Sequence, residues 1–166
     1  HRLHARDAAA QMHTRRMLVS DQRDREAVVI DYRVDGAPVP EQLRSLYDAV
    51  GWTAYTDDPQ SLVAGVAGSA NVVTAWDDET LVGLARVISD GHTIAYLQDV
   101  LVRPEHRRRG VATELVRRVF EPFASVRQHV LLTDAEPGQS RFYESLGFRE
   151  TRDFPGAGLR AFVRLP

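Results

Sequence analysis

Two spacings of apolar residues alternate along this 166-residue chain and divide it into predicted strands and helices. No internal repeat or low-complexity linker interrupts them. Stretches rich in β-branched residues, bounded by Asp, Gly or Pro, predict strands at residues 27–33, 71–76, 80–88, 93–102, 129–133 and 159–165. Apolar residues three or four positions apart predict helices within residues 39–52 and 58–68, from Val111 to Pro122, and from Pro137 to Gly147.

The order of these elements predicts one mixed α/β domain. A strand and two helices come first, three strands joined by tight hairpins follow, and helix, strand, helix and strand complete the chain. The strand–helix–strand stretch of residues 93–133 should place two parallel strands side by side in the sheet. The short apolar strand at residues 129–133 is of the kind that is buried in a sheet's interior.

Residues 1–26 differ in composition from the rest of the chain. They are polar, contain three irregularly spaced histidines, and lack the apolar centre of a signal peptide. We expect them to form an N-terminal extension that is disordered or partly not native. The folded domain is expected to span residues 27–166.

Composition excludes several classes of function. The net charge of −2 argues against nucleic acid as the main partner. Without cysteine the chain has no disulfide, thiolate metal site or cysteine nucleophile, which is typical of a reducing cytoplasm. No apolar run approaches the roughly 20 residues of a membrane span. We therefore expect a cytoplasmic protein that binds neither nucleic acid nor membranes.

Three consecutive arginines precede the helix that begins at Val111, in the segment EHRRRGVATELVRRVF. A nucleic-acid patch, a solvated loop and a phosphate cradle would each explain this charge. The first N–H groups of a helix have no internal partner, and Gly110 lets a ligand approach them closely. The glycine patterns of Walker A and Rossmann nucleotide sites are absent.

The chain resembles the GNAT superfamily of acyl-CoA N-acyltransferases. Arg107-x-x-Gly110-x-Ala112 matches the family's Arg/Gln-x-x-Gly-x-Gly/Ala signature, and RFYESLGF (141–148) is similar to its second landmark. The resemblance covers residues 27–166. It implies a central, mostly antiparallel sheet with one parallel strand pair splayed at the CoA site, flanked by helices. It also implies direct transfer of an acetyl group from acetyl-CoA to a primary amine of a small molecule or protein, without a metal.

The same resemblance implies the residues that hold acetyl-CoA. The strand before the arginines would run along the pantetheine arm, with the Val100 N–H donating to the thioester carbonyl. The loop and helix start would hold the pyrophosphate. The implied binding residues are Val100, Leu101, Val102, Arg107, Arg108, Arg109, Gly110, Val111, Ala112 and Thr113.

Tyr143 and Gln98 are the candidate catalytic residues. Tyr143 lies at the family's usual tyrosine and would protonate the departing thiolate, facing the cleft while Phe142 fills the core. Relatives with a carboxylate or histidine base carry it at positions matching Tyr96 or Gln98, and neither residue is a good base. Gln98 could orient a water that removes the proton. Asp99 should point away from the cleft unless a bulge turns it, and serve as a structural acceptor.

Some features leave alternatives open. Glu136 stands where many relatives have an asparagine that binds the pantetheine arm, which puts that contact in doubt. Trp52 and Tyr55 would line the acceptor side or serve as ordinary core aromatics. Because a base is missing, a non-catalytic acyl-CoA-binding sensor remains the alternative to an enzyme. A homodimer is also left open.

Overall fold

The structure of the protein, a computed structural model, describes residues 27–34 and 38–165. Residues 1–30 and 31–166 form separate units, and the extension predicted at residues 1–26 lies outside the described residues. Residues 27–30 form no regular structure. The strands are β1 (Asp31–Val34), β2 (Asn71–Asp77), β3 (Thr80–Ser89), β4 (Ile94–Val102) and β5 (Gln128–Leu131). The helices are α2 (Pro40–Ala49), α3 (Thr53–Thr56), α4 (Pro59–Ala67), α5 (Val111–Phe120) and α6 (Pro137–Ser145), with 3-10 turns at Pro104–His106, Glu121–Phe123 and Thr151–Asp153.

The five strands form one mixed sheet in the order β1-β2-β3-β4-β5. The first four are antiparallel neighbours, whereas β4 and β5 run parallel. The predicted fold class and the parallel pair are therefore confirmed. The parallel pairing is short, and its last register is Leu97 opposite Leu131. Beyond that point β4 continues without β5.

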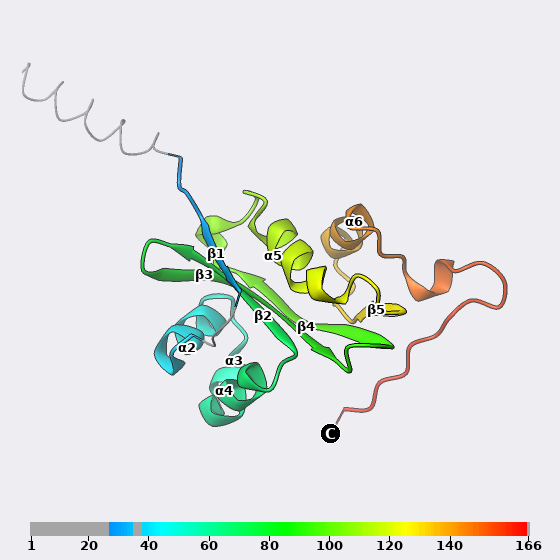
Figure 1. The fold of residues 1–166 in the computed structure, drawn as a ribbon, viewed down its shortest axis with the longest axis horizontal. Helices are drawn as coiled ribbons and strands as arrows, with labels where there is room; N and C mark the ends of the chain where they lie inside the picture. Colours follow the sequence, from blue (N-terminus) through cyan, green and yellow to red (C-terminus); the bar gives the residue numbers. More distant parts are fainter. Residues whose placement is uncertain (1–26, 35–37, 166) are drawn as a thin grey trace, which may run out of the picture. The chain divides into compact units, whose positions relative to one another are not determined.

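Helices cover both faces of the sheet. Helices α2 to α4 lie on one face, and α5 and α6 on the other (Figure 1). The α2–α4 face contains the main apolar cluster, formed by Leu43, Leu46, Tyr47, Leu62, Val66, Trp76, Leu81, Leu84 and Leu101. On the opposite face α5 buries Val111, Leu115, Val116 and Val119. Among the described residues, no helix is both long and apolar enough to cross a bilayer.

Three sequence predictions about strands are wrong. The first strand begins at Asp31 instead of residue 27, and Val29 is 84% exposed. Strand β5 lies at the edge of the sheet and is partly exposed instead of buried in its interior, because it pairs with β4 alone. Residues 159–165 form no strand. Their alternating pattern suits a strand, but residues 160–165 have no pairing neighbour in the described part, and Phe162 is 88% exposed.

Gly83 sets the distance between α5 and the sheet. A Cβ built on this residue would lie 2.9 Å from Leu115 Cδ1 and 3.2 Å from the Leu101 carbonyl oxygen. A side chain on β3 would therefore push α5 outward. Because α5 carries the phosphate cradle proposed from the sequence, this close contact also positions that site.

We predict that Gly83→Ala lowers the free energy of unfolding by about 1–3 kcal/mol, the usual cost of overpacking a core. Urea denaturation measures it as a lower midpoint at unchanged slope. Gly138→Ala is the matched control, because its Cβ meets nothing within 4 Å. The control should leave stability unchanged or slightly raised. Equal effects of the two substitutions would contradict the proposed role of Gly83.

Candidate active site

The backbone of β4 turns free hydrogen-bonding groups toward the side where β5 has ended. The N–H of Arg103 donates to the Val82 carbonyl at 2.8 Å, so Arg103 faces β3. Because backbone groups alternate in direction along a strand, Val102 and Val100 point theirs away from β3. No described strand covers that side beyond Leu97. The Val100 N–H is therefore available to an extended ligand.

The loop after β4 leads into a helix start with free amide groups. Arg108 and Gly110 both have left-handed backbone conformations, with φ of 57° and 78°. Gly110 is the residue before α5, and no side chain caps the helix. The N–H of Glu114 is the first to bond within the helix, to the Gly110 carbonyl at 3.1 Å. The three N–H groups before Glu114, on Val111, Ala112 and Thr113, remain free for an anion.

The arginines of this loop have different partners. Arg107 Nε donates to the Val102 carbonyl at 3.1 Å and Arg103 Nε to the Leu81 carbonyl at 2.8 Å, so both hold the loop against the sheet. Arg108 and Arg109 are exposed and form no hydrogen bond or ion pair with any described residue. Their guanidinium groups are thus available beside the free amides, an arrangement that suits a pyrophosphate.

Other nearby charged groups bond within the protein. His106 is buried, and its Nε2 lies 2.9 Å from Asp77 Oδ2, which anchors the loop to the end of β2. On α5, hydrogen bonds from Arg117 and Arg118 lower the pKa of Glu114 to about 2. Since Glu114 binds both of these arginines, the free cations of this region are those that precede Gly110.

Tyr143 is more deeply buried than its sequence neighbour, which reverses one expectation. Its side chain is 9% exposed, whereas Phe142 is only half-buried. Its ring packs against Phe142 and Phe148, with ring centroids 4.9 Å and 6.0 Å away. Burial, followed by the nearby charge of Asp134, raises the pKa of Tyr143 to about 12. Its hydroxyl bonds to no described residue and is still not fully buried.

An open groove of about 1350 Å³ runs beside Tyr143. Strand β5, residues 133–137, the inner side of α6 and part of the C-terminal segment line it. Glu136 precedes α6 without capping it through its side chain, and Pro137 occupies the first turn. The helix therefore begins without the asparagine contact that the resemblance would have implied.

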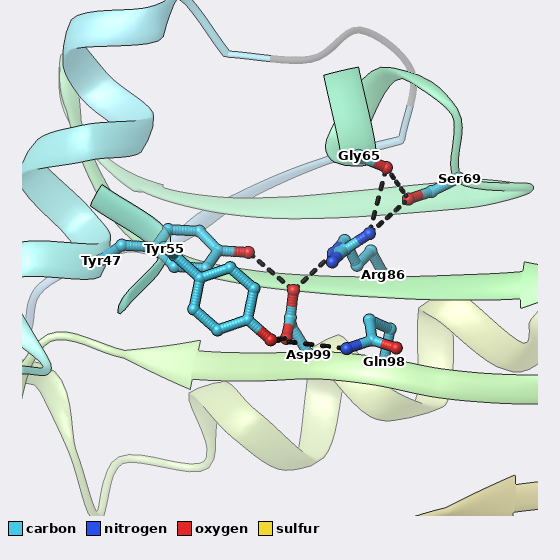
Figure 2. Close-up of polar contacts among 7 residues, drawn as sticks. All are labelled: Tyr47, Tyr55, Gly65, Ser69, Arg86, Gln98 and Asp99. Atoms are coloured by element: carbon cyan, nitrogen blue, oxygen red, sulfur yellow. Dashed lines mark hydrogen bonds and ion pairs between the residues drawn. The ribbon is translucent and has the colours of Figure 1, made fainter. Parts of the chain in front are cut away.

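Gln98 and Asp99 occupy a β-bulge in β4. Asp99 lies opposite Arg86 of β3 while Leu97 lies opposite Val87, so Gln98 is an extra residue without a partner. Regular alternation would send the two side chains to opposite faces, but both reach the hydroxyl of Tyr55 (Figure 2). The bulge that the sequence analysis named as the exception to regular alternation is thus present at this position.

Asp99 is the acceptor at the centre of a buried polar network. It is 2% exposed and forms an ion pair with Arg86, whose side chain also donates to the Gly65 carbonyl at 3.0 Å. The hydroxyl of Tyr47 donates to Asp99 at 2.9 Å and that of Tyr55 at 3.2 Å. Burial, then the charge of Asp99, raises the pKa of both tyrosines, which therefore remain donors. Asp99 is a structural acceptor as expected, but side chains supply its hydrogen bonds.

Sequence reasoning missed Arg86 and Tyr47 as partners of Asp99. A signal was present, because each of two largely apolar strands contains a single charged residue, in LVGLARVI and YLQDVLV. Opposite charges in neighbouring buried strands are expected to pair. The hydrogen bonds from α2 and α3 could not be predicted from the sequence around Asp99, because their tyrosines are more than 40 positions away from it.

Trp52 and Tyr55 form a partly exposed aromatic surface beside this network. Their rings are stacked with centroids 5.9 Å apart, and Trp52 is 36% exposed. Tyr47 packs against both from within the core. Tyr55 thus packs against the core through Tyr47 and also contacts Gln98 at the surface. Within the described ranges, no three His, Asp or Glu residues are close enough together to hold a metal ion.

Comparisons with known proteins agree with this geometry. The family model of the acetyltransferase (GNAT) domain matches residues 68–150, half of the chain, which include β2 to α6. A protein of Gibberella zeae with a provisional acetyltransferase name is 33% identical over 78 residues. That match covers 45% of this chain and 43% of the relative, so the chain spans less than half of that protein.

Solved structures extend the likeness to most of the chain. A GNAT-family acetyltransferase from Streptococcus pneumoniae superposes with a TM-score of 0.70 at 27% identity, covering 82% of this chain and 100% of the other. An aminoglycoside N-acetyltransferase in complex with CoA shares the fold, with a TM-score of 0.64 at 19% identity and coverage of 86% and 97%. The short parallel strand pair and the helix start with free amides thus occur here in a chain that belongs to the GNAT family of acetyltransferases.

Proposed function

We propose that the protein is an N-acetyltransferase that moves an acetyl group from acetyl-CoA to a primary amine of a small molecule or protein. The observation that carries this proposal is a series of free donors: the Val100 N–H on β4, and then the N–H groups of Val111, Ala112 and Thr113 at the start of α5. A pantetheine amide and a pyrophosphate would find partners along it in that order. The CoA bound by the aminoglycoside N-acetyltransferase of the same fold supports the choice of donor.

The roles of the binding residues follow from the groups that they present. Free amides of Val111, Ala112 and Thr113, with the Gly110 turn before them, would hold the pyrophosphate, and Arg108 and Arg109 would add charge beside it. Arg107 would act by fixing the loop to β4. The backbone of residues 100–102 would pair with the pantetheine arm, and the Val100 N–H would bind the oxyanion that forms at the thioester carbonyl.

The proposed reaction forms a C–N bond and breaks a C–S bond. The neutral amine attacks the thioester carbon, and the tetrahedral intermediate collapses with loss of the CoA thiolate. Tyr143, which its raised pKa keeps protonated at neutral pH, would give its proton to that thiolate and then regain one from solvent. The amine proton would leave through water beside Gln98, since Asp99 is engaged by Arg86 and two tyrosines.

A sensor that binds acyl-CoA without turnover is the second candidate. The glutamine at position 98, where some relatives have a base, favours it. Against it stands the hydroxyl of Tyr143, which has no partner in the described residues. A direct measurement of CoA release in the presence of amines separates the two candidates, because only the enzyme would release CoA. Because the chain has no cysteine, a thiol reagent reports released CoA without background from the protein.

We predict that acetyl-CoA raises the melting temperature in proportion to the logarithm of its concentration, and that Gly110→Ala weakens this effect. The new Cβ would stand in the cradle and strain the left-handed turn. Gly91→Ala is the matched control, because Gly91 has φ of 79° and equally open surroundings in the hairpin between β3 and β4. Both variants should lose similar stability, and only Gly110→Ala should lose acetyl-CoA affinity. A wild-type melting temperature that is flat up to millimolar acetyl-CoA would overturn the proposed function.

We predict that Tyr143→Phe lowers kcat by about 10²–10⁴-fold, the usual contribution of one general acid, while acetyl-CoA affinity is retained. Since the pKa of Tyr143 is about 12, loss of this proton should not slow the wild type up to roughly pH 10. Steady-state kinetics over this pH range measure both effects. Tyr32→Phe removes a hydroxyl from β1 and should leave kcat unchanged. Wild-type turnover by Tyr143→Phe would exclude the assigned role.

A further inference from the structure

The hydrogen bonds around Asp99 have a direction that chemistry dictates. A carboxylate only accepts, so the contacts of Asp99 with Arg86, Tyr47 and Tyr55 must all be donated to it. The single hydroxyl proton of Tyr55 is therefore committed to Asp99 Oδ1, 3.2 Å away. The Tyr55 oxygen can therefore form any further hydrogen bond only as an acceptor.

The direction of these bonds determines how the Gln98 amide is turned. Its amide group lies 3.4 Å from the Tyr55 oxygen, and an oxygen that can only accept requires the NH₂ side of the amide there. The carbonyl oxygen of Gln98 must then point away from Tyr55. It has no partner among the described residues, and it is not among their fully buried unpaired atoms, so a ligand can reach it.

Gln98 stands next to the proposed site of chemistry. It is the extra residue of the bulge, two positions before Val100, whose N–H is free on the β5 side. The bulge turns Gln98 toward α3, where Tyr55 meets it, as Figure 2 shows. An amine attacking a thioester held at Val100 from the α3 side would thus pass the Gln98 carbonyl oxygen.

We propose that Asp99, acting through the Tyr55 hydroxyl, orients Gln98 so that its carbonyl oxygen accepts an N–H of the acceptor amine. This inference rests on the proposed acetyltransferase activity. The bond aims the nitrogen lone pair at the thioester carbon and stabilises the positive charge that the nitrogen gains as it attacks. Gln98 contacts the acceptor directly, whereas Asp99 and Tyr55 are positioning residues.

The chain offers a matched pair of variants for the test. Tyr55→Phe and Tyr47→Phe each delete one hydroxyl that donates to Asp99, but only Tyr55 also contacts Gln98. Benzylamine, tryptamine, spermidine, kanamycin and a lysine peptide serve as acceptors, with thiol release as the readout. For the amine that the wild type accepts best, Tyr55→Phe should lower kcat/KM about tenfold, the worth of one hydrogen bond. Tyr47→Phe should lower the melting temperature and change kcat/KM less than twofold.

A second measurement separates positioning from loss of structure. In a Gln98→Ala background, which lacks the amide altogether, Tyr55→Phe should have no further effect on kcat/KM. The inference is overturned if Tyr55→Phe acts as strongly there as in the wild type, or no more strongly than Tyr47→Phe. This comparison of single and double variants does not use Tyr47→Phe, so it tests the inference even if that variant fails to fold. A wild type that binds acetyl-CoA but acetylates no amine of the panel overturns the proposed activity, and this inference with it.

Discussion

The buried ion pair between Arg86 and Asp99 holds together the elements around the proposed acceptor side. It joins β3 to β4, and its hydrogen bonds reach α2, α3 and α4 through Tyr47, Tyr55 and the Gly65 carbonyl. Leaving one charge of such a pair unpartnered costs about 3–5 kcal/mol, so the surrounding donors are kept in place by a strong penalty. Tyr55 thereby stays fixed although the short helix that carries it spans only Thr53–Thr56.

The two edges of β4 differ in how far they are paired with a neighbouring strand. Toward β3 the strand is paired on both sides of the bulge at Gln98, and its side chains on the α2–α4 face build the polar network. Toward β5 its last residues are unpaired, because the parallel register ends at Leu97. The opening therefore needs no special side chain. The opening arises because β4 extends beyond the end of β5. The close contact at Gly83 lets α5 lie near the sheet, which places the free amides beside this opening.

Local patterns predicted most of this arrangement. The α5 stripe and the turn at Gly110 depend on residues close together in sequence, where periodicity and backbone preference decide. The parallel pair follows from the general rule for two strands joined through a helix. The predictions failed where the structure of a segment depends on which strands or side chains lie beside it in the fold. Residues 159–165 have strand composition but no neighbour, and an apolar β5 does not reveal whether a second strand covers its other edge. The free amides at the start of α5 could thus be anticipated from the chain, whereas the position of the bulge could not, because it depends on the register of β3 against β4.

The bulge also gives a physical reason for a neutral residue at position 98. Tyr55 has one hydroxyl proton, and Asp99 already accepts it in a buried setting. A carboxylate in place of the Gln98 amide would compete for that proton, and two acceptor oxygens would then face each other without a donor between them. Glutamine avoids this conflict, because it donates to the Tyr55 oxygen with one side of its amide and keeps an acceptor on the other. The network that stabilises the α2–α4 face therefore disfavours a strong base at this position, and in the proposed reaction removal of the amine proton is left to water.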